Sequence, residues 1–184
     1  MIHAFILRKH QEGLQLETIK IRKAYADDLT ALLTLSQELN LARDIGYFEQ
    51  VLGSDDAKDQ CVFLAERDDV PLGFVVLNWV PKYGYYKSLG CSEIQDLNVL
   101  PVYRNRGIGS ILVKSAEAEA REKGHEQIGI SVGLTASYGP AQRLYVHMGY
   151  VPDGYGVTYD RQAVTHGEFR SIDDDLCLMM VKGL

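Results

Sequence analysis

The sequence predicts an α/β (α+β) domain in which a central sheet is flanked by helices. Segments that alternate apolar and polar residues, typical of strands, interleave with segments whose apolar residues recur every three or four positions, typical of helices. These patterns follow the order β-α-α-β-β-β-α-β-α-β-β. The 184 residues, of which 46% are hydrophobic, are enough for one complete hydrophobic core. We therefore expect one domain.

Glycine, proline and charged clusters separate the elements and give their approximate bounds. Strands are predicted at 18–23, 61–66, 72–80, 94–99, 127–134, 150–159 and 176–182. Helices are predicted at 28–39 and 45–52, from 108 to Gly124, and from Gly139 to Gly149. Gly73, inside a strand, leaves room for a close neighbour. The tyrosine-rich segment 81–87 is predicted to be a loop that is either the wall of an acceptor site or a packed surface.

Composition limits the classes of partner. A net charge of −6 and a pI of about 5.3 argue against nucleic acid or an anionic membrane as the main partner and mildly favour a cationic one. Cys61, Cys91 and Cys177 form no CxxC motif, which indicates free thiols and a cytoplasmic location. No stretch has the length of a membrane span, and the five histidines show no spacing typical of a metal site.

The most informative stretch is 93–124, which has the pattern of a strand, a basic glycine-bearing loop and a helix. Glycines allow the backbone to approach a ligand, and the first amides of a helix point outward with the positive end of the helix dipole behind them. Two arginines add charge, so the loop is suited to bind phosphate. A Walker loop would need Gly-Lys-Ser/Thr and a dinucleotide fingerprint a third glycine, and the loop has neither.

The motif R-x-x-G-x-G follows a strand of the form L-x-V-x-P-x-Y-R, and a second segment, G-P-A-Q-R-L-Y-V-H-M-G-Y, occupies 139–150. Both resemble the cofactor-binding segments of the GNAT superfamily of N-acetyltransferases. By order of elements the resemblance extends from about Ile19 to the C-terminus. It implies a mixed, mostly antiparallel sheet, a single domain at 17–184 and an N-terminal extension at 1–16 of unclear role, either an edge strand or a loosely attached arm.

The resemblance implies that acetyl-CoA is the co-substrate and that no metal takes part. The main chain of Leu97 and Val99 would pair with the pantetheine arm, and the loop would hold the pyrophosphate. The residues assigned to the cofactor are Leu97, Asn98, Val99, Arg104, Asn105, Arg106, Gly107, Ile108, Gly109, Ser110 and Ala141. One departure is Tyr138, which occupies the position of an asparagine that often contacts pantetheine in this family.

The resemblance also assigns the two groups that move protons. Glu93, eleven residues before Arg104, matches the general base of GNAT histone acetyltransferases; the alternatives are a solvated strand carboxylate, a base at Asp96, or a chain of water molecules. Asp96 is expected on the opposite face of the strand unless a bulge intervenes. Tyr145 matches the tyrosine that protonates the leaving thiolate, the alternative being a core aromatic. Cys91 is expected to be a small buried residue rather than a nucleophile.

The predicted reaction is direct attack by the primary amine of a small acceptor on acetyl-CoA in a ternary complex. Net charge and the run Asp173–Asp175 favour a cationic acceptor. Two alternatives stay open at this point: a protein N-terminal or lysine acetyltransferase, and a non-catalytic acyl-CoA-binding or sensing module on the same fold. GNAT domains often pair through terminal strands, which makes a homodimer an expectation of the resemblance.

Overall fold

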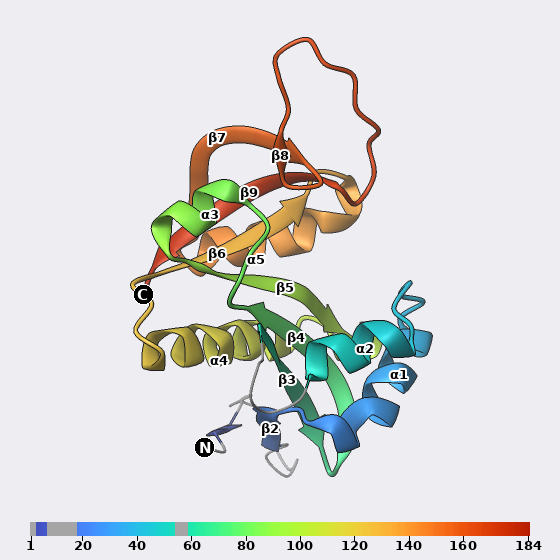
Figure 1. Ribbon diagram of the computed structural model, residues 1–184. Helices are drawn as coiled ribbons and strands as arrows, with labels where there is room; N and C mark the ends of the chain where they lie inside the picture. The colour runs from blue at the N-terminus through green and yellow to red at the C-terminus, as the bar shows by residue number, and fades with distance from the viewer. Residues whose placement is uncertain (1–2, 7–17, 54–58) are drawn as a thin grey trace. The chain divides into compact units, whose positions relative to one another are not determined.

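The computed structural model describes residues 3–6, 18–53 and 59–184, which form two compact units. Unit 1 holds the described residues up to Asn78 together with Asp96–Ala118, and unit 2 holds Trp79–Gln95 together with Glu119–Leu184. The strands (Figure 1) are β1 (His3–Ile6), β2 (Thr18–Lys23), β3 (Gln60–Arg67), β4 (Val70–Asn78), β5 (Ser92–Val99), β6 (Gln127–Gly133), β7 (Val151–Tyr159), β8 (Gln162–Ala163) and β9 (Leu176–Gly183). The helices are α1 (Leu29–Glu38), α2 (Ile45–Leu52), α3 (Gly84–Leu89), α4 (Ile108–Glu122) and α5 (Gly139–His147).

Hydrogen bonds link the strands in the order β1-β2-β3-β4-β5-β6-β9-β7-β8. β5 and β6 are parallel, with a register that runs from Ser92↔Ile128 to Ile94↔Ile130. The pairs β1–β2, β2–β3, β3–β4, β6–β9, β7–β9 and β7–β8 are antiparallel. The predicted α/β (α+β) class with a mixed, mostly antiparallel sheet is therefore confirmed, as is the order of the predicted elements.

Beyond the predicted elements the structure has β8 and α3, and β1 is an edge strand, one of the two alternatives for residues 1–16. Residues 3–6 of the predicted N-terminal extension form β1, which pairs with β2, whereas the rest of 1–16 lies outside the described residues. A two-residue strand, β8, follows β7. The prediction of a loop over residues 81–87 is wrong, because helix α3 begins at Gly84 and ends at Gly90 in a left-handed conformation (φ 62°).

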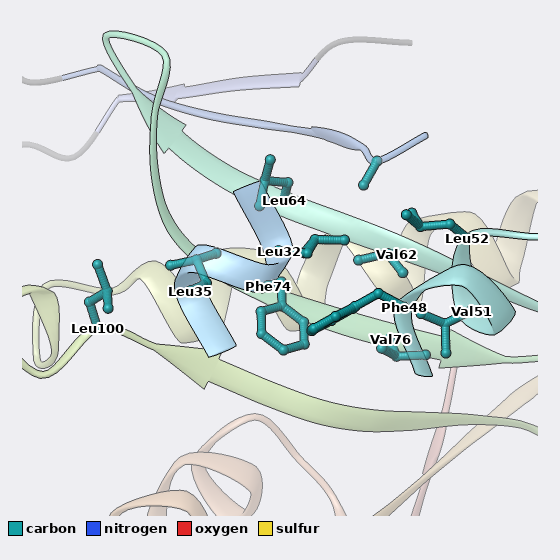
Figure 2. Close-up of a cluster of buried hydrophobic side chains, with 11 residues drawn as sticks. Leu32, Leu35, Phe48, Val51, Leu52, Val62, Leu64, Phe74, Val76 and Leu100 are labelled. Carbon is teal, nitrogen blue, oxygen red and sulfur yellow. The ribbon is translucent and has the colours of Figure 1, made fainter. Parts of the chain in front are cut away.

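The core of unit 1 lies between the first two helices and strands β3 and β4 (Figure 2). Leu32 and Leu35 of α1 and Phe48 of α2 are fully or almost fully buried, as the helical spacing of their apolar residues predicts. The Phe48 ring meets the edge of Phe74 from β4 at 5.8 Å between ring centroids. Helices α1 and α2 are thereby fixed to the sheet, and with them the linker between the two helices.

In unit 2, Tyr86 of α3 packs into the sheet. Its ring is fully buried and occupies the space that a side chain at Gly129 would need. Its hydroxyl lies 2.7 Å from the carbonyl of Met180 and 3.0 Å from that of Ile130. Tyr83 is also buried and donates to Asp153 Oδ2 at 2.7 Å. Of the two interpretations of the tyrosine-rich segment, these residues therefore fit a packed surface.

Gly73 of β4 confirms the prediction of a close neighbour. A Cβ at this position would overlap the carbonyl oxygen of Asn98 and lie 3.0 Å from the Cα of Val99, both in β5. Leu100, which follows β5, donates its amide to the Leu72 carbonyl at 2.9 Å. Because the neighbouring atoms belong to the main chain, they cannot move aside without shifting the strand that carries candidate cofactor residues.

We expect Gly73→Ala to lower the free energy of unfolding by about 2 kcal/mol, because it forces two strands apart in a packed region. Urea denaturation measures the loss. Gly183→Ala is the matched control, since Gly183 also lies in a strand but a Cβ there meets no atom within 4 Å. Equal stability losses in the two variants would contradict the close approach of β4 and β5.

Candidate active site

Glu93 lies in the first half of β5, where the strand pairs with β6 opposite Gly129. The side chain is completely buried. Its Oε2 accepts a hydrogen bond of 2.9 Å from the Gln95 amide, and its Oε1 lies 3.2 Å from Nη2 of Arg161. The carboxylate is therefore not a solvated strand residue, and each of its oxygens has a partner.

Arg161 was not found from the sequence as a site residue. It lies in the two-residue turn between β7 and β8, where Tyr159 pairs with Gln162. Both turn residues have positive φ, 45° at Asp160 and 61° at Arg161, as in a type I′ hairpin turn. The sequence signal for this turn is weak, because it consists only of Asp at the first turn position of a short hairpin. No local pattern shows that Arg161 contacts Glu93, 68 positions away along the chain.

The pKa of Glu93 is raised by burial, which disfavours the charged carboxylate. Arg161, Gln95 and Lys82 each lower the pKa and so oppose the effect of burial without cancelling it. A carboxylate with a raised pKa is a better proton acceptor near neutral pH than an exposed one. The environment of Glu93 is therefore suited to a general base.

Tyr145 lies on α5, which begins at Gly139 with Pro140 in its first turn. The residue is 5% exposed, and its ring lies 6.1 Å from that of Tyr150 between centroids. Burial raises the pKa of its hydroxyl. The phenol therefore stays protonated throughout the physiological range, which a proton donor requires.

The loop before α4 has the backbone that the sequence predicts. Asn105 and Gly107 have positive φ, 59° and 84°, which is the region that asparagine and glycine enter most easily. Ile111 donates its amide to the Gly107 carbonyl at 3.1 Å. The amides of residues 108–110 therefore belong to the first turn, where a helix provides no acceptor of its own.

Arginines surround this loop. The Arg104 side chain donates to the Val99 carbonyl at 2.9 Å, and the Arg106 guanidinium lies 5.5 Å from the centre of the Tyr103 ring. Arg67, at the end of β3, lies over the same ring and donates to its hydroxyl at 3.2 Å; no sequence pattern indicates that it lies here. Positive φ, first-turn amides and three guanidinium groups make this loop suited to an anion such as a diphosphate.

The second half of β5 contains the bulge that the sequence left open. Asp96 has a φ of 46° in the middle of the strand, and Leu97, Asn98 and Val99 follow half-buried. Its carboxylate is bound by Arg43, with both contacts at 3.0 Å, and by the hydroxyl of Tyr47. Both carboxylates have partners, but Glu93 is completely buried and its pKa is raised, so Glu93 is the better candidate for the base.

Three further positions named from the sequence, Ala141, Tyr138 and Cys91, have different surroundings. Ala141 lies half-buried in the first turn of α5. Tyr138, the departure from the family pattern, donates its hydroxyl to Asp174 Oδ1 at 2.8 Å, and its ring covers Gly133. Cys91 is buried, and burial raises the pKa of its thiol, as expected for a packed cysteine rather than a nucleophile.

Comparison with known proteins gives the family. The family model described as "Acetyltransferase (GNAT) family" matches residues 22–150. The chain belongs to the GNAT acetyltransferase family. It is 32% identical over 129 residues to an uncharacterized N-acetyltransferase of Archaeoglobus fulgidus, a match that covers 64% of this chain and 84% of the relative. It is 34% identical over 87 residues to the aminoalkylphosphonate N-acetyltransferase of Salmonella typhimurium, which covers 47% of this chain and about half (54%) of that protein.

Solved structures confirm the GNAT fold. Arabidopsis thaliana NAA60 in complex with acetyl-CoA superimposes with a TM-score of 0.67 at 18% identity, over 90% of this chain and 98% of that one. As a member of this family the protein is an acyltransferase. Within residues 3–6, 18–53 and 59–184, no helix is long and apolar enough to cross a membrane, and no group of three His, Cys, Asp or Glu is placed to hold a metal ion.

The pair Arg161–Glu93 gives a test that does not depend on turnover. Because Arg161 lowers the pKa of Glu93, we expect Arg161→Gln to raise that pKa above its wild-type value and Arg161→Lys to raise it less. Titration of ¹³C-labelled glutamate carboxyl groups by NMR measures the change, with Glu93→Gln to assign the signal. Glutamine and lysine meet the same strain at this positive φ, so a difference between the two variants is not caused by the backbone. A pKa that falls or stays the same in Arg161→Gln would show that the ion pair is not formed.

Proposed function

We propose that this GNAT-family protein transfers the acetyl group of acetyl-CoA to the primary amine of a small acceptor, by direct attack in a ternary complex. The observation that carries the proposal is the loop 104–110, whose left-handed Gly107 and first-turn amides are suited to a diphosphate. The relative NAA60, solved with acetyl-CoA, supports the same co-substrate. When bound, acetyl-CoA supplies an activated thioester carbonyl and a thiolate leaving group.

The proposed cofactor residues have distinct tasks. The main-chain amides of Ile108, Gly109 and Ser110 donate to phosphate oxygens, and Arg104 and Arg106 neutralise their charge. The main chain of β5 at Leu97–Val99 pairs with the pantetheine arm as an added strand would. Asn105 and Ala141 are the remaining residues of the proposed cofactor site. No particular side-chain contact with the cofactor is assigned to them.

The proposed chemistry needs a neutral amine, because an ammonium has no lone pair and alkylamines keep their proton until about pH 10. Glu93 accepts that proton, either directly or through water, and its raised pKa makes it a stronger base than an exposed glutamate. Arg161 holds the Glu93 carboxylate in place and stabilises it before the proton arrives. Tyr145 donates its phenolic proton to the departing thiolate, of pKa about 8.5.

We propose a small primary amine as the acceptor, on the aminoalkylphosphonate named for one relative. The net charge of −6 is the argument for a cationic amine, since an aminoalkylphosphonate itself also carries negative charge. The acidic run contributes less than the sequence suggests. Asp173 accepts from the Tyr159 hydroxyl and Asp174 from that of Tyr138, each at 2.8 Å, so both carboxylates have structural partners. The main alternative acceptor is a protein N-terminus or lysine. Recognition of a protein would depend on surfaces other than the residues of the candidate active site.

We also propose that residues 17–184 form a single catalytic domain, of which the family model matches 22–150. Three free cysteines, Cys61, Cys91 and Cys177, support a reducing compartment and hence a cytoplasmic location. In this proposal the strand at 3–6 extends the sheet edge next to β2 and takes no part in catalysis.

A panel of amines tests the proposal. We expect purified protein to bind acetyl-CoA in calorimetry and to release free thiol when supplied with acetyl-CoA and an accepted amine. The panel should include an aminoalkylphosphonate, a polyamine, an aminoglycoside, amino acids and peptides with free N-termini. Binding of acetyl-CoA without thiol release for any amine would instead identify a sensing module. Turnover only with peptides would replace the small acceptor by a protein.

We expect Tyr145→Phe to reduce kcat about 100-fold, the usual contribution of a general acid, while its affinity for acetyl-CoA stays near the wild-type value. Steady-state kinetics and calorimetry measure the two quantities. Tyr150→Phe removes a hydroxyl from the neighbouring buried ring and serves as the control, with kcat expected near the wild-type value. Wild-type kcat in Tyr145→Phe would remove the acid role from this residue.

A further inference from the structure

The backbone of β5 has a feature that its sequence does not require. Asp96 adopts a left-handed conformation, φ 46°, with strand residues on both sides. This region is unfavourable for residues with a side chain, and aspartate enters it mainly in turns. A left-handed residue inside a strand persists only where its surroundings hold it. The residues that contact Asp96 therefore control the path of the chain into Leu97.

Three side chains hold Asp96, and all lie in unit 1. Arg43 contacts both carboxylate oxygens, through Nε to Oδ2 and Nη2 to Oδ1, each at 3.0 Å. This bidentate geometry fixes direction as well as distance. The Tyr47 hydroxyl donates to Oδ2, and the Asn98 amide donates to the main-chain carbonyl of Asp96 at 3.1 Å. Asp96, Arg43 and Tyr47 are called the Asp96 network below.

The Asp96 network is built on rigid supports. Ser36, buried on α1, donates to the main-chain carbonyl of Arg43 at 2.8 Å. The Asp44 side chain caps α2 by accepting from the Tyr47 amide at 3.0 Å. The Arg43 guanidinium also lies 4.8 Å from the centre of the Tyr47 ring. Contacts within the chain thus hold both side chains of the linker between α1 and α2.

We propose that Arg43 and Tyr47 are positioning residues that keep Asp96 left-handed, so that the main chain of Leu97–Val99 is already arranged to bind acetyl-CoA. This inference rests on the proposed function, in which those three residues pair with the cofactor. None of these contacts of the Asp96 network involves the loop 104–110 or Glu93. It acts through Asp96 on the direction of the strand alone.

Substitutions at Asp96 separate backbone conformation from charge. Asp96→Gly and Asp96→Ala both remove the carboxylate, but only glycine accepts a φ of 46° without strain. We expect acetyl-CoA to bind Asp96→Gly within about threefold of wild type and Asp96→Ala at least about tenfold more weakly, because an energy of about 1.4 kcal/mol corresponds to tenfold in affinity. Calorimetry measures both affinities, and circular dichroism verifies that each variant is folded.

Rescue of an altered Arg43 by Asp96→Gly covers the case in which Asp96→Ala does not fold, because it compares Arg43→Ala with and without the glycine. Arg43→Ala should weaken acetyl-CoA binding about tenfold, Arg43→Lys less, and Tyr47→Phe by an intermediate amount. Adding Asp96→Gly to Arg43→Ala should restore affinity, whereas adding Asp96→Ala should not, although both remove the carboxylate that has lost its partner. A purely stabilising ion pair would give equal affinities in the two double variants.

The outcomes separate this inference from the proposed function. Equal acetyl-CoA affinities for the glycine and alanine variants would overturn the positioning role and leave the acetyltransferase proposal intact. Wild-type protein that binds acetyl-CoA but acetylates no amine would overturn the catalytic proposal, while the binding series would still decide the role of Arg43 and Tyr47. Wild-type protein that binds no acetyl-CoA would overturn both.

Discussion

The left-handed backbone at Asp96 is the constraint on which the arrangement of β5 depends. Before it, Ser92–Ile94 are buried and pair with β6; after it, the strand continues half-buried to Val99, ahead of the loop that we propose binds phosphate. A regular strand would keep its pleat and present its side chains by strict alternation. The left-handed residue interrupts this alternation, and the strand carries a buried carboxylate before it and half-buried residues after it.

Two arginines from distant parts of the chain hold the two carboxylates of this strand. Arg161, in a hairpin turn, contacts Glu93, which is completely buried and has a raised pKa. Arg43, in the linker between two helices, contacts Asp96, which is half-buried and has a tyrosine as second partner. The difference in burial agrees with the different tasks that we propose for the two acids: Glu93 accepts a proton, and Asp96 holds a backbone conformation.

Hydrogen bonds between tyrosine and aspartate occur in both units, and they change what the acidic composition implies about the acceptor. Hydroxyl groups of tyrosine donate to aspartate in four pairs: Tyr47–Asp96, Tyr83–Asp153, Tyr138–Asp174 and Tyr159–Asp173. Each pair joins segments that are separated along the chain. Several of the negatively charged side chains therefore hold loops and turns in place. Support for a cationic acceptor consequently comes from the net charge and not from the run 173–175.

The sequence by itself determined the order of strands and helices, the family, the loop 104–110 and the need for glycine at position 73, because each depends on residues that are neighbours in the chain or on one residue's size. It did not determine α3, the pairing of Arg161 with Glu93, the position of Arg67 or the Asp96 network. These depend on side chains that meet only after folding, across separations of 68 positions for Arg161 and Glu93 and 53 for Arg43 and Asp96. Local patterns report which face of an element is buried, but the partner of a buried charge is chosen by tertiary packing.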